Sequence, residues 1–236
     1  MSILDIPIKS VPLPQTDCVI SEQSDERFVD IYTYSDKTVK VSMQYAISGI
    51  DGAITTAYVR KSVADRLLQA KKLLPSGYTF EILDAWRPYD VQLALYNAYK
   101  RKILKDLTGT LSEDEIKKRV CEFVSYPDKS KKVSFVHSCG GAVDLTIVDG
   151  DGNRLDMGSD FDEFTKRSYT DYYEKVGMDE RVRKNRRLLY HTMCSNGFTN
   201  YPAEWWHYDF GDSFWSFYTG KNAIYTSRFE VEEVIG

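Results

Sequence analysis

The sequence is short of the residues that mark several classes of protein. Its 236 residues include 3 histidines and 4 cysteines, and the cysteines at positions 18, 121, 139 and 194 form no C-x-x-C pair. We therefore expect reduced thiols rather than disulfides. The N-terminus lacks a basic region followed by a long apolar run, and no later stretch approaches membrane-spanning length. These absences predict a cytoplasmic protein with no membrane partner.

An excess of positive charge is also missing. Lys and Arg number 31 against 35 Asp and Glu, which gives a formal net charge of -4 and argues against a nucleic-acid partner. With 42% hydrophobic and 28% charged residues, the composition is typical of a globular protein. The chain has no internal repeat and no Pro/Gly-rich linker. We therefore predict a single domain over residues 1–236, with an irregular segment over about residues 1–28.

Four helices are expected, the first of them from its hydrophobic spacing. Val63, Leu67, Leu68 and Leu74 recur at helical spacing over 62–74, before the Pro-Ser-Gly stop at 75–77. The others are expected over about 90–104, from Ser112 onward, and over about 180–195. Ser112 and Glu115 have the spacing of a capping box.

Strands are expected between and beside these helices. The predicted strand segments are 29–34, 38–45, 78–83, 133–137, 142–148 and 205–210, with a turn at 149–152. Strands grouped in the middle of the chain, with helices before and after, predict an α+β fold: a central antiparallel sheet flanked by helices, with a metal site on the sheet.

The first candidate functional segment is H-S-C-G-G-A-V-D, residues 137–144. Two adjacent glycines let the backbone turn tightly, so that His137 and Asp144 can face the same point. Imidazole nitrogen and carboxylate oxygen both bind zinc, and catalytic zinc sites commonly combine three protein ligands with a water. The pair is a candidate for two metal ligands; the alternative is a hydrogen-bonded histidine near a turn aspartate.

The second candidate segment is E-W-W-H, residues 204–207. Residues three apart on a straight strand point to opposite faces, so one shared site requires a bend near Glu204 or a position of Glu204 just outside the strand. His207 would then bind a metal while Glu204 reaches the attacking water. The alternative is a surface glutamate beside a packed aromatic strand.

Arg87 follows the strand expected at 78–83 and precedes Pro88. A guanidinium at the end of a strand can stabilise the oxyanion that forms when a carbonyl is attacked. The alternative is a structural salt bridge with Asp84.

Together these segments resemble the D-alanyl-D-alanine dipeptidases and related D,D-carboxypeptidases. Residues 137–144 resemble the H-x-x-G-x-A-x-D zinc motif of that family, 204–207 its E-x-x-H motif, and D-A-W-R-P at 84–88 its D-x-x-R-P segment. M-G-S-D-F-D at 157–162 agrees as well. The resemblance runs from about residue 29 to 210, and several motifs in the same order are far more specific than one.

The resemblance implies a role for each matching residue. One Zn²⁺ per chain would be held by three ligands, His137, Asp144 and His207. The catalytic residues would be Glu204, the general base, and Arg87, which would stabilise the tetrahedral intermediate. The substrate contacts would be Asp84, Asp162 and Tyr32.

The chain departs from the family pattern next to the first zinc histidine. Relatives usually have a serine two positions before it, and dipeptidases often have another immediately before it. Here those positions are Phe135 and Val136, Ser134 is displaced by one, and Cys139 replaces a frequent arginine. Because the metal motif is intact, we expect these changes to affect peptide specificity or rate.

The implied function is zinc-dependent hydrolysis of D-alanyl-D-alanine to two D-alanines, with the small dipeptide as the partner. One alternative is a D,D- or L,D-carboxypeptidase acting on longer cell-wall peptides; the missing export signal and wall-binding repeat favour the dipeptide. The other is a non-catalytic zinc- or peptide-binding module. Glu204 and Arg87 argue against such a module, because a structural zinc needs neither.

Three weaker patterns have simpler interpretations. The run D-G-D-G-N at 149–153 is similar to a calcium loop, but its sixth position is Arg154 where an EF-hand needs glycine, so a hairpin turn is expected. Cys139 could act as a nucleophile activated by His137, yet that histidine is better used on zinc. His191 lies in the last predicted helix and is expected to be a packing or surface residue.

Overall fold

The centre of the fold is a five-stranded sheet in the order β3–β5–β6–β8–β7. The computed structural model describes residues 2–14, 20–24, 26–107, 109–129, 136–175 and 177–235. The sheet strands are β3 (Lys40–Val41), β5 (Thr79–Asp84), β6 (Ala142–Val148), β8 (His207–Asp209) and β7 (Thr199–Asn200). β3 runs parallel to β5, whereas the other neighbouring pairs are antiparallel. The predicted α+β fold with a central sheet flanked by helices is confirmed, and the sheet is antiparallel as predicted except at the β3–β5 pair.

Two small strand pairs lie outside the central sheet. β1 (Ile20–Ser24) runs parallel to β9 (Ala223–Tyr225), and β2 (Phe28–Asp30) runs antiparallel to β4 (Tyr58–Arg60). Short helical segments connect the elements: α1 (Ile31–Tyr34), α2 (Gln44–Ile47), α7 (Ser213–Thr219), α8 (Glu232–Ile235) and the 3-10 turns η1 (Ile3–Asp5), η2 (His137–Cys139), η3 (Lys166–Ser168) and η4 (Tyr172–Glu174).

The long helices match the predicted ones closely. They are α3 (Lys61–Lys71), α4 (Tyr89–Asp106), α5 (Glu113–Cys121) and α6 (Glu180–Cys194). α3 buries Val63, Ala64, Leu67 and Ala70, the stripe that a helix packed on a sheet presents. The capping box is present at α5, where Ser112 Oγ accepts from the Glu115 N–H and the Glu115 carboxylate accepts from the Ser112 N–H.

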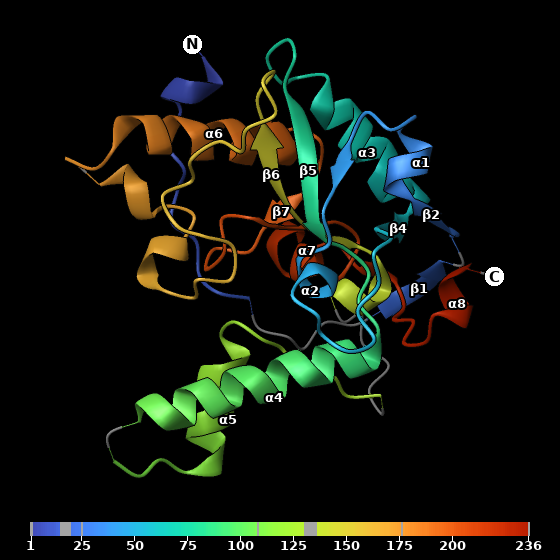
Figure 1. The fold of residues 1–236 in the computed structure, drawn as a ribbon, viewed down its shortest axis with the longest axis vertical. Helices are drawn as coiled ribbons and strands as arrows, with labels where there is room; N and C mark the ends of the chain where they lie inside the picture. The colour runs from blue at the N-terminus through green and yellow to red at the C-terminus, as the bar shows by residue number, and fades with distance from the viewer. Residues whose placement is uncertain are drawn as a thin grey trace.

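The main core lies on one face of the sheet. α3 and α6 contact each other, and their apolar side chains join Val143, Leu145 and Ile147 of β6 in one buried cluster. Because side chains alternate along a strand, Asp144 and Thr146 point to the opposite face. Figure 1 shows the α4–α5 hairpin apart from α3 and α6, at the other end of the molecule. The two faces of β6 therefore separate the main core from the side that carries Asp144.

Several predicted strands are shorter than expected or interrupted by helices. The strand predicted at 29–34 ends at Asp30, because the Asp30 carboxylate accepts hydrogen bonds from the N–H groups of Tyr32 and Thr33 and starts α1. The strand predicted at 38–45 is reduced to β3 and followed by α2. The segment 205–210 keeps only His207–Asp209 as strand.

The segments at 133–137 and 1–28 also differ from the prediction. Residues 133–135 lie outside the described residues, and His137 begins the 3-10 turn η2 instead of ending a strand. Within the N-terminal segment expected to be irregular, η1 and β1 are ordered elements. No helix in the described part of the chain combines the length and hydrophobicity needed to cross a bilayer.

Candidate metal centre and active site

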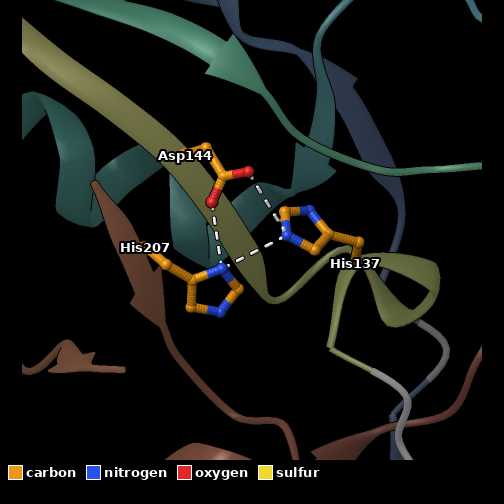
Figure 2. A group of neighbouring side chains, drawn as sticks. All are labelled: His137, Asp144 and His207. Carbon is orange, nitrogen blue, oxygen red and sulfur yellow. Dashed lines mark hydrogen bonds and ion pairs between the residues drawn. The ribbon is translucent and has the colours of Figure 1, made fainter. Parts of the chain in front are cut away.

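Three side chains converge on the face of the sheet opposite the main core. His137, Asp144 and His207 each offer one ligand atom, and these atoms lie within 4.8 Å of one another. His207 Nδ1 is 2.9 Å from Asp144 Oδ1 and 3.3 Å from His137 Nε2, and His137 Nε2 is 3.5 Å from Asp144 Oδ2. Figure 2 shows the three side chains pointing toward a common centre. The structure therefore brings together the three residues predicted as ligands.

Strand register positions two of them. Asp144 of β6 lies directly opposite His207 of β8, and Asp84 of β5 lies opposite Asp144 on its other side. Directly opposite residues point to the same face of a sheet, with Cβ atoms about 4.5–5.5 Å apart. A row of three polar residues thus crosses three neighbouring strands.

A glycine turn positions the third. Gly140 ends η2 with φ 75°, a left-handed conformation that glycine adopts without strain. Added Cβ atoms would overlap the Phe28 ring at Gly140 and lie 2.5 Å from the Phe210 carbonyl oxygen at Gly141. Both glycines are required for the chain to turn from η2 into β6 within this space, so the predicted tight turn is confirmed.

Each histidine is oriented through its other ring nitrogen. The Ala85 carbonyl lies 2.8 Å from His137 Nδ1, and because a carbonyl only accepts, Nδ1 carries the hydrogen and Nε2 presents its lone pair. The Asp209 carboxylate lies 2.8 Å from His207 Nε2 and leaves Nδ1 facing the centre. Metal-binding histidines show this arrangement, in which a carbonyl or carboxylate holds the outer nitrogen.

The two ligand histidines have opposite electrostatic environments. Burial opposes the charged form of His207, but Asp209 and Asp144 raise its pKa well above the usual value. Burial, reinforced by the Arg87 guanidinium, lowers the pKa of His137 to about 3. The pKa of Asp144 is lowered, because the two histidines outweigh the effect of its burial. Asp144 and Asp209 thus stabilise positive charge on the His207 side of the cluster. The donor set of two imidazoles and one carboxylate suits zinc.

Glu204 lies just outside β8, as one of the two predicted arrangements requires. It occupies the loop between β7 and β8, and its Oε2 is 3.8 Å from His207 Nδ1. The carboxyl is buried, and burial raises its pKa well above the usual value. A buried carboxylate beside a cation site is suited to accepting a proton.

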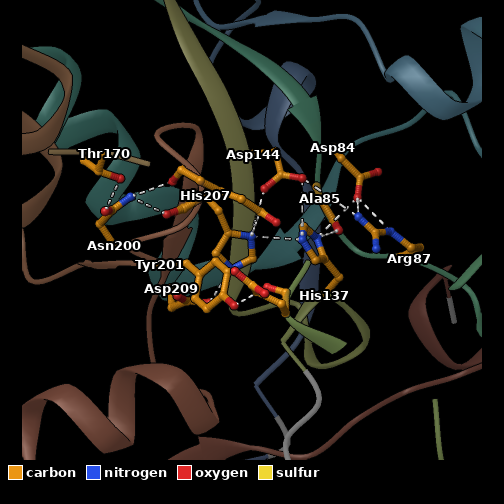
Figure 3. A network of polar contacts seen from close by, with 12 residues as sticks. Asp84, Ala85, Arg87, His137, Asp144, Thr170, Asn200, Tyr201, His207 and Asp209 are labelled. Atoms are coloured by element: carbon orange, nitrogen blue, oxygen red, sulfur yellow. Dashed lines mark hydrogen bonds and ion pairs between the residues drawn. The ribbon is translucent and has the colours of Figure 1, made fainter. Parts of the chain in front are cut away.

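Arg87 does form the salt bridge with Asp84 that was the structural alternative. Its Nε and Nη2 donate to Asp84 Oδ2 at 3.0 and 2.7 Å, and its Nη1 donates to Gln92 Oε1 at 2.5 Å. A guanidinium has five N–H groups, so these three bonds orient the group without exhausting its donors. Arg87 also lines the cavity described next, and Nη2 lies 3.9 Å from Asp144 Oδ2. Figure 3 shows Arg87 and Asp84 beside His137. The salt bridge with Asp84 therefore still leaves the guanidinium able to donate into the cavity.

A cavity of about 290 Å³ opens over these residues. Its charged end contains Arg87, Asp162, Glu204 and the three metal-ligand candidates. Its other wall is largely apolar and comes from α4, α5 and the residues that follow α5. This combination of an apolar wall and a few convergent polar groups is typical of a small-molecule site.

The predicted substrate residues are distributed unevenly around the cavity. Asp162 lines it, and burial raises the pKa of this carboxyl to about 7. Asp84 lies behind Arg87, and its pKa is also raised by burial to about 7. Tyr32 does not line the cavity: its side chain is 42% exposed on α1. Tyr45 and Tyr201 do line the cavity, Tyr45 beside Arg87 and Tyr201 with its ring centre 5.9 Å from that of His207, and the sequence interpretation missed both.

Tyr45 contacts two of the residues in question. Its hydroxyl hydrogen-bonds to Asp162 and so lowers the pKa of that carboxyl against the effect of burial, and the Arg87 guanidinium carbon lies 4.8 Å from the centre of its ring. Neither contact has a local sequence pattern, because Tyr45 is one of 17 tyrosines and meets Asp162 only through the fold.

The residues next to the first ligand histidine occupy different environments. Val136 and Ser138 line the cavity, whereas Phe135 lies outside the described residues. Cys139 is buried in the main core, where its thiol bonds to the Val136 carbonyl at 3.1 Å. That position does not suit the alternative in which Cys139 is a nucleophile.

The two remaining patterns have structural roles. Asp149 Oδ1 accepts from the N–H groups of Asp151 and Asn153 and closes the predicted turn. His191 Nε2 lies 2.8 Å from the Ile6 carbonyl and packs α6 against the N-terminal segment.

Comparisons with known proteins agree with this geometry. A family model described as D-ala-D-ala dipeptidase matches residues 41–227. A D-alanyl-D-alanine dipeptidase of Synechocystis is 32% identical over 190 residues, covering 73% of this chain and 77% of the relative. One from Escherichia coli is 33% identical over 135 residues, covering 57% and 56%. The solved structure of the LdcB LD-carboxypeptidase covers 82% of this chain and 71% of its own, with 17% identity and a TM-score of 0.41, a likeness too low to indicate function.

Proposed function

The chain belongs to the D-ala-D-ala dipeptidase family of metallopeptidases, and from this premise we propose that it hydrolyses D-alanyl-D-alanine to two D-alanines with one zinc ion per chain. The observation that carries the proposal is the convergence of three buried ligand atoms with Glu204 and Arg87 around one cavity. A structural metal site would need neither of the last two residues.

The proposed ligands are His137 Nε2, an oxygen of Asp144 and His207 Nδ1. When bound, zinc lowers the pKa of a water from about 15.7 toward 7 and polarises a carbonyl. The chain's contribution is to hold both imidazoles in the required tautomer through Ala85 and Asp209. Orientation from outside the ligand set typically matters about 10–100-fold for metal affinity or activity.

Glu204 is the proposed general base. It would take the proton of the attacking water and give it to the leaving amine, a role typically contributing about 10²–10⁴-fold. Its position 3.8 Å from His207 Nδ1 places the carboxylate beside the cation site without making it one of the three clustered ligands. The raised pKa supports the second half of the role, because a protonated carboxyl is the species that donates to the amine.

Arg87 is the proposed stabiliser of negative charge on the scissile carbonyl oxygen. Asp84 and Gln92 hold its guanidinium at the charged end of the cavity, so little reorganisation is required when the oxyanion forms. Asp162, hydrogen-bonded to Tyr45, is the proposed contact for the substrate ammonium group.

The test is release of free D-alanine from D-Ala-D-Ala, with and without a chelator, together with metal analysis. We expect chelator-sensitive release and about one zinc per chain. His207→Ala should lose metal and activity, whereas His191→Ala, a histidine outside the cavity, should keep both.

The other outcomes separate the alternatives. Faster hydrolysis of an N-blocked tripeptide than of the dipeptide would identify a carboxypeptidase of longer peptides. Bound zinc without hydrolysis of either peptide would contradict the proposed activity and leave a metal-binding module.

A further inference from the structure

The loop between β7 and β8 carries the two residues on which the proposed reaction depends most. It leaves β7 after Asn200, contains Glu204 and re-enters the sheet at His207. Asn200 pairs with Tyr208 across the ladder, so its backbone is fixed at the base of the loop. The spacing of Glu204 and His207 therefore depends on how this loop is closed.

The main-chain bond from the Tyr201 N–H to the His207 carbonyl closes the base of the loop, and the Asn200 side chain bridges it to Glu204. Asn200 Nδ2 donates to the Glu204 carbonyl at 3.1 Å and to the His207 carbonyl at 2.9 Å, which uses both amide hydrogens. Its Oδ1 accepts from Thr170 Oγ1 at 2.7 Å, and the side chain is buried. Figure 3 shows Asn200 between Thr170 and the strand that carries His207. One buried amide thus joins the main chain of the proposed base to that of a proposed ligand.

The two residues depend on this amide to different degrees. The His207 ring is also held by Asp144 and by Asp209, and its backbone lies in the ladder of β8. Glu204 lies outside the ladder, and its placement comes from its main chain. There, its N–H donates to the Tyr201 carbonyl at 3.1 Å and its carbonyl accepts from the His207 N–H at 3.3 Å, besides the bond from Asn200. Loss of the amide should therefore move Glu204 more than His207.

We propose that Asn200 is a positioning residue for the reaction, which sets the Glu204 carboxylate against the metal centre by holding the Glu204 and His207 carbonyls together. This proposal rests on the proposed function for its catalytic meaning, whereas the clamp itself can be tested on structure alone. Asparagine is suited to the place because it supplies two donors and one acceptor; aspartate would direct negative charge at two carbonyl oxygens.

Asn200→Ala is the variant that tests the proposal. It should fold, because the Glu204 carbonyl keeps the His207 N–H and the His207 carbonyl keeps the Tyr201 N–H as donors. Displacement of a catalytic group by about 1 Å can cost on the order of 100-fold, so we expect kcat to fall roughly 10- to 100-fold. KM and the zinc dissociation constant, measured by competition with a chelating dye, should change less than about threefold.

Two further variants serve as controls. Thr170→Val removes the hydroxyl that orients the amide but keeps both Nδ2 donors, so its kcat should stay within about threefold of the wild type. Asn196→Ala removes another partly buried side-chain amide, which donates to the Thr192 carbonyl at the end of α6, and should leave kcat and zinc affinity unchanged.

A crystal structure of Asn200→Ala completes the test. We expect the Glu204 carboxylate to leave its position 3.8 Å from His207 Nδ1, while the 2.9 Å contact between His207 and Asp144 persists. An unmoved Glu204, or zinc affinity lost in parallel with kcat, would overturn the proposal. If the wild type does not hydrolyse D-Ala-D-Ala, the proposed function fails, and the crystal structure still decides whether Asn200 positions Glu204.

Discussion

At the scale of single residues, Arg87 illustrates how one side chain serves the fold and the site together. Asp84 and Gln92 take three of its N–H groups, and the buried guanidinium still lines the cavity. A lysine at this position would keep the charge but could not reproduce the planar fork that two oxygens of different residues hold in place.

Arg87→Lys is therefore expected to lower kcat by about 10²–10³-fold, the usual cost of losing an oxyanion donor. Arg154→Lys is the matched control. Arg154 lies outside the cavity and makes a similar forked pair with Glu81, with N–O distances of 2.7 and 3.0 Å. Steady-state kinetics on D-Ala-D-Ala measure both variants. Equal rates for Arg87→Lys and the wild type would remove Arg87 from the reaction.

Glu204 gives the second prediction at this scale. Glu204→Gln keeps the shape of the side chain and removes the base, so turnover should fall about 10²–10⁴-fold while zinc content is retained. Glu122 also lines the cavity, and as the control Glu122→Gln should keep most of the activity. Metal analysis beside the rate measurement checks the assignment: loss of zinc in proportion to activity would make Glu204 a ligand instead of the base.

At the scale of elements, the turn from η2 into β6 positions His137. Gly140 needs a left-handed φ of 75° and lies against the Phe28 ring. Gly49 has a similar φ of 73°, with no atom within 4 Å of an added Cβ. The two positions differ in the space around them and share the backbone strain that a side chain would bring.

Alanine at the two positions should therefore differ in its effect. Gly49→Ala is expected to lower the free energy of unfolding by about 1–2 kcal/mol through φ alone. Gly140→Ala should cost about 1–3 kcal/mol more through overpacking, and should weaken zinc binding because His137 moves with the turn. Urea unfolding and zinc titration provide the measurements. Equal losses of stability, with zinc affinity intact, would show that the turn does not hold the ligand.

The elements also show which parts of the fold local sequence predicts. α3 follows from helical spacing, and α5 from the capping box of Ser112 and Glu115, since these interactions span only a few residues. The strand predicted at 29–34 was wrong after Asp30. The local sequence does not show whether this aspartate caps a helix or continues a strand, and in the structure it caps α1. β8 is shorter than predicted because the tryptophans before it belong to the loop that Asn200 bridges.

At the scale of the whole molecule, the proposed metal joins distant parts of the chain. His137 lies 70 residues from His207, and Asp144 lies 63 residues from it, so the three ligands meet only when η2, β6 and β8 have assembled. A ligand that binds the folded state and not the unfolded chain stabilises the fold by about 4.1 kcal/mol at a thousandfold excess over its dissociation constant.

Removal of zinc should accordingly lower the unfolding temperature. For a chain of this length, a change of about 1 kcal/mol in the free energy of unfolding shifts Tm by roughly 2–4 °C. If zinc is present at a thousandfold excess over its dissociation constant, its removal by a chelator is therefore expected to lower Tm by about 8–16 °C. Added zinc should restore it, and His191→Ala should respond as the wild type does. Scanning calorimetry at fixed zinc concentration makes the measurement; the same Tm with and without chelator would contradict a metal that links these elements.

The sequence by itself determined the family and much of the local structure. The types and order of residues in H-S-C-G-G-A-V-D and E-W-W-H identify the family, and periodicity and capping predict the long helices, because these patterns are short-range. Only the tertiary structure decided that Asp144 lies opposite His207, that Tyr45 instead of Tyr32 reaches the cavity, and that Asn200 bridges the loop of Glu204. These relations depend on strand register and on contacts between distant segments, which no local pattern contains.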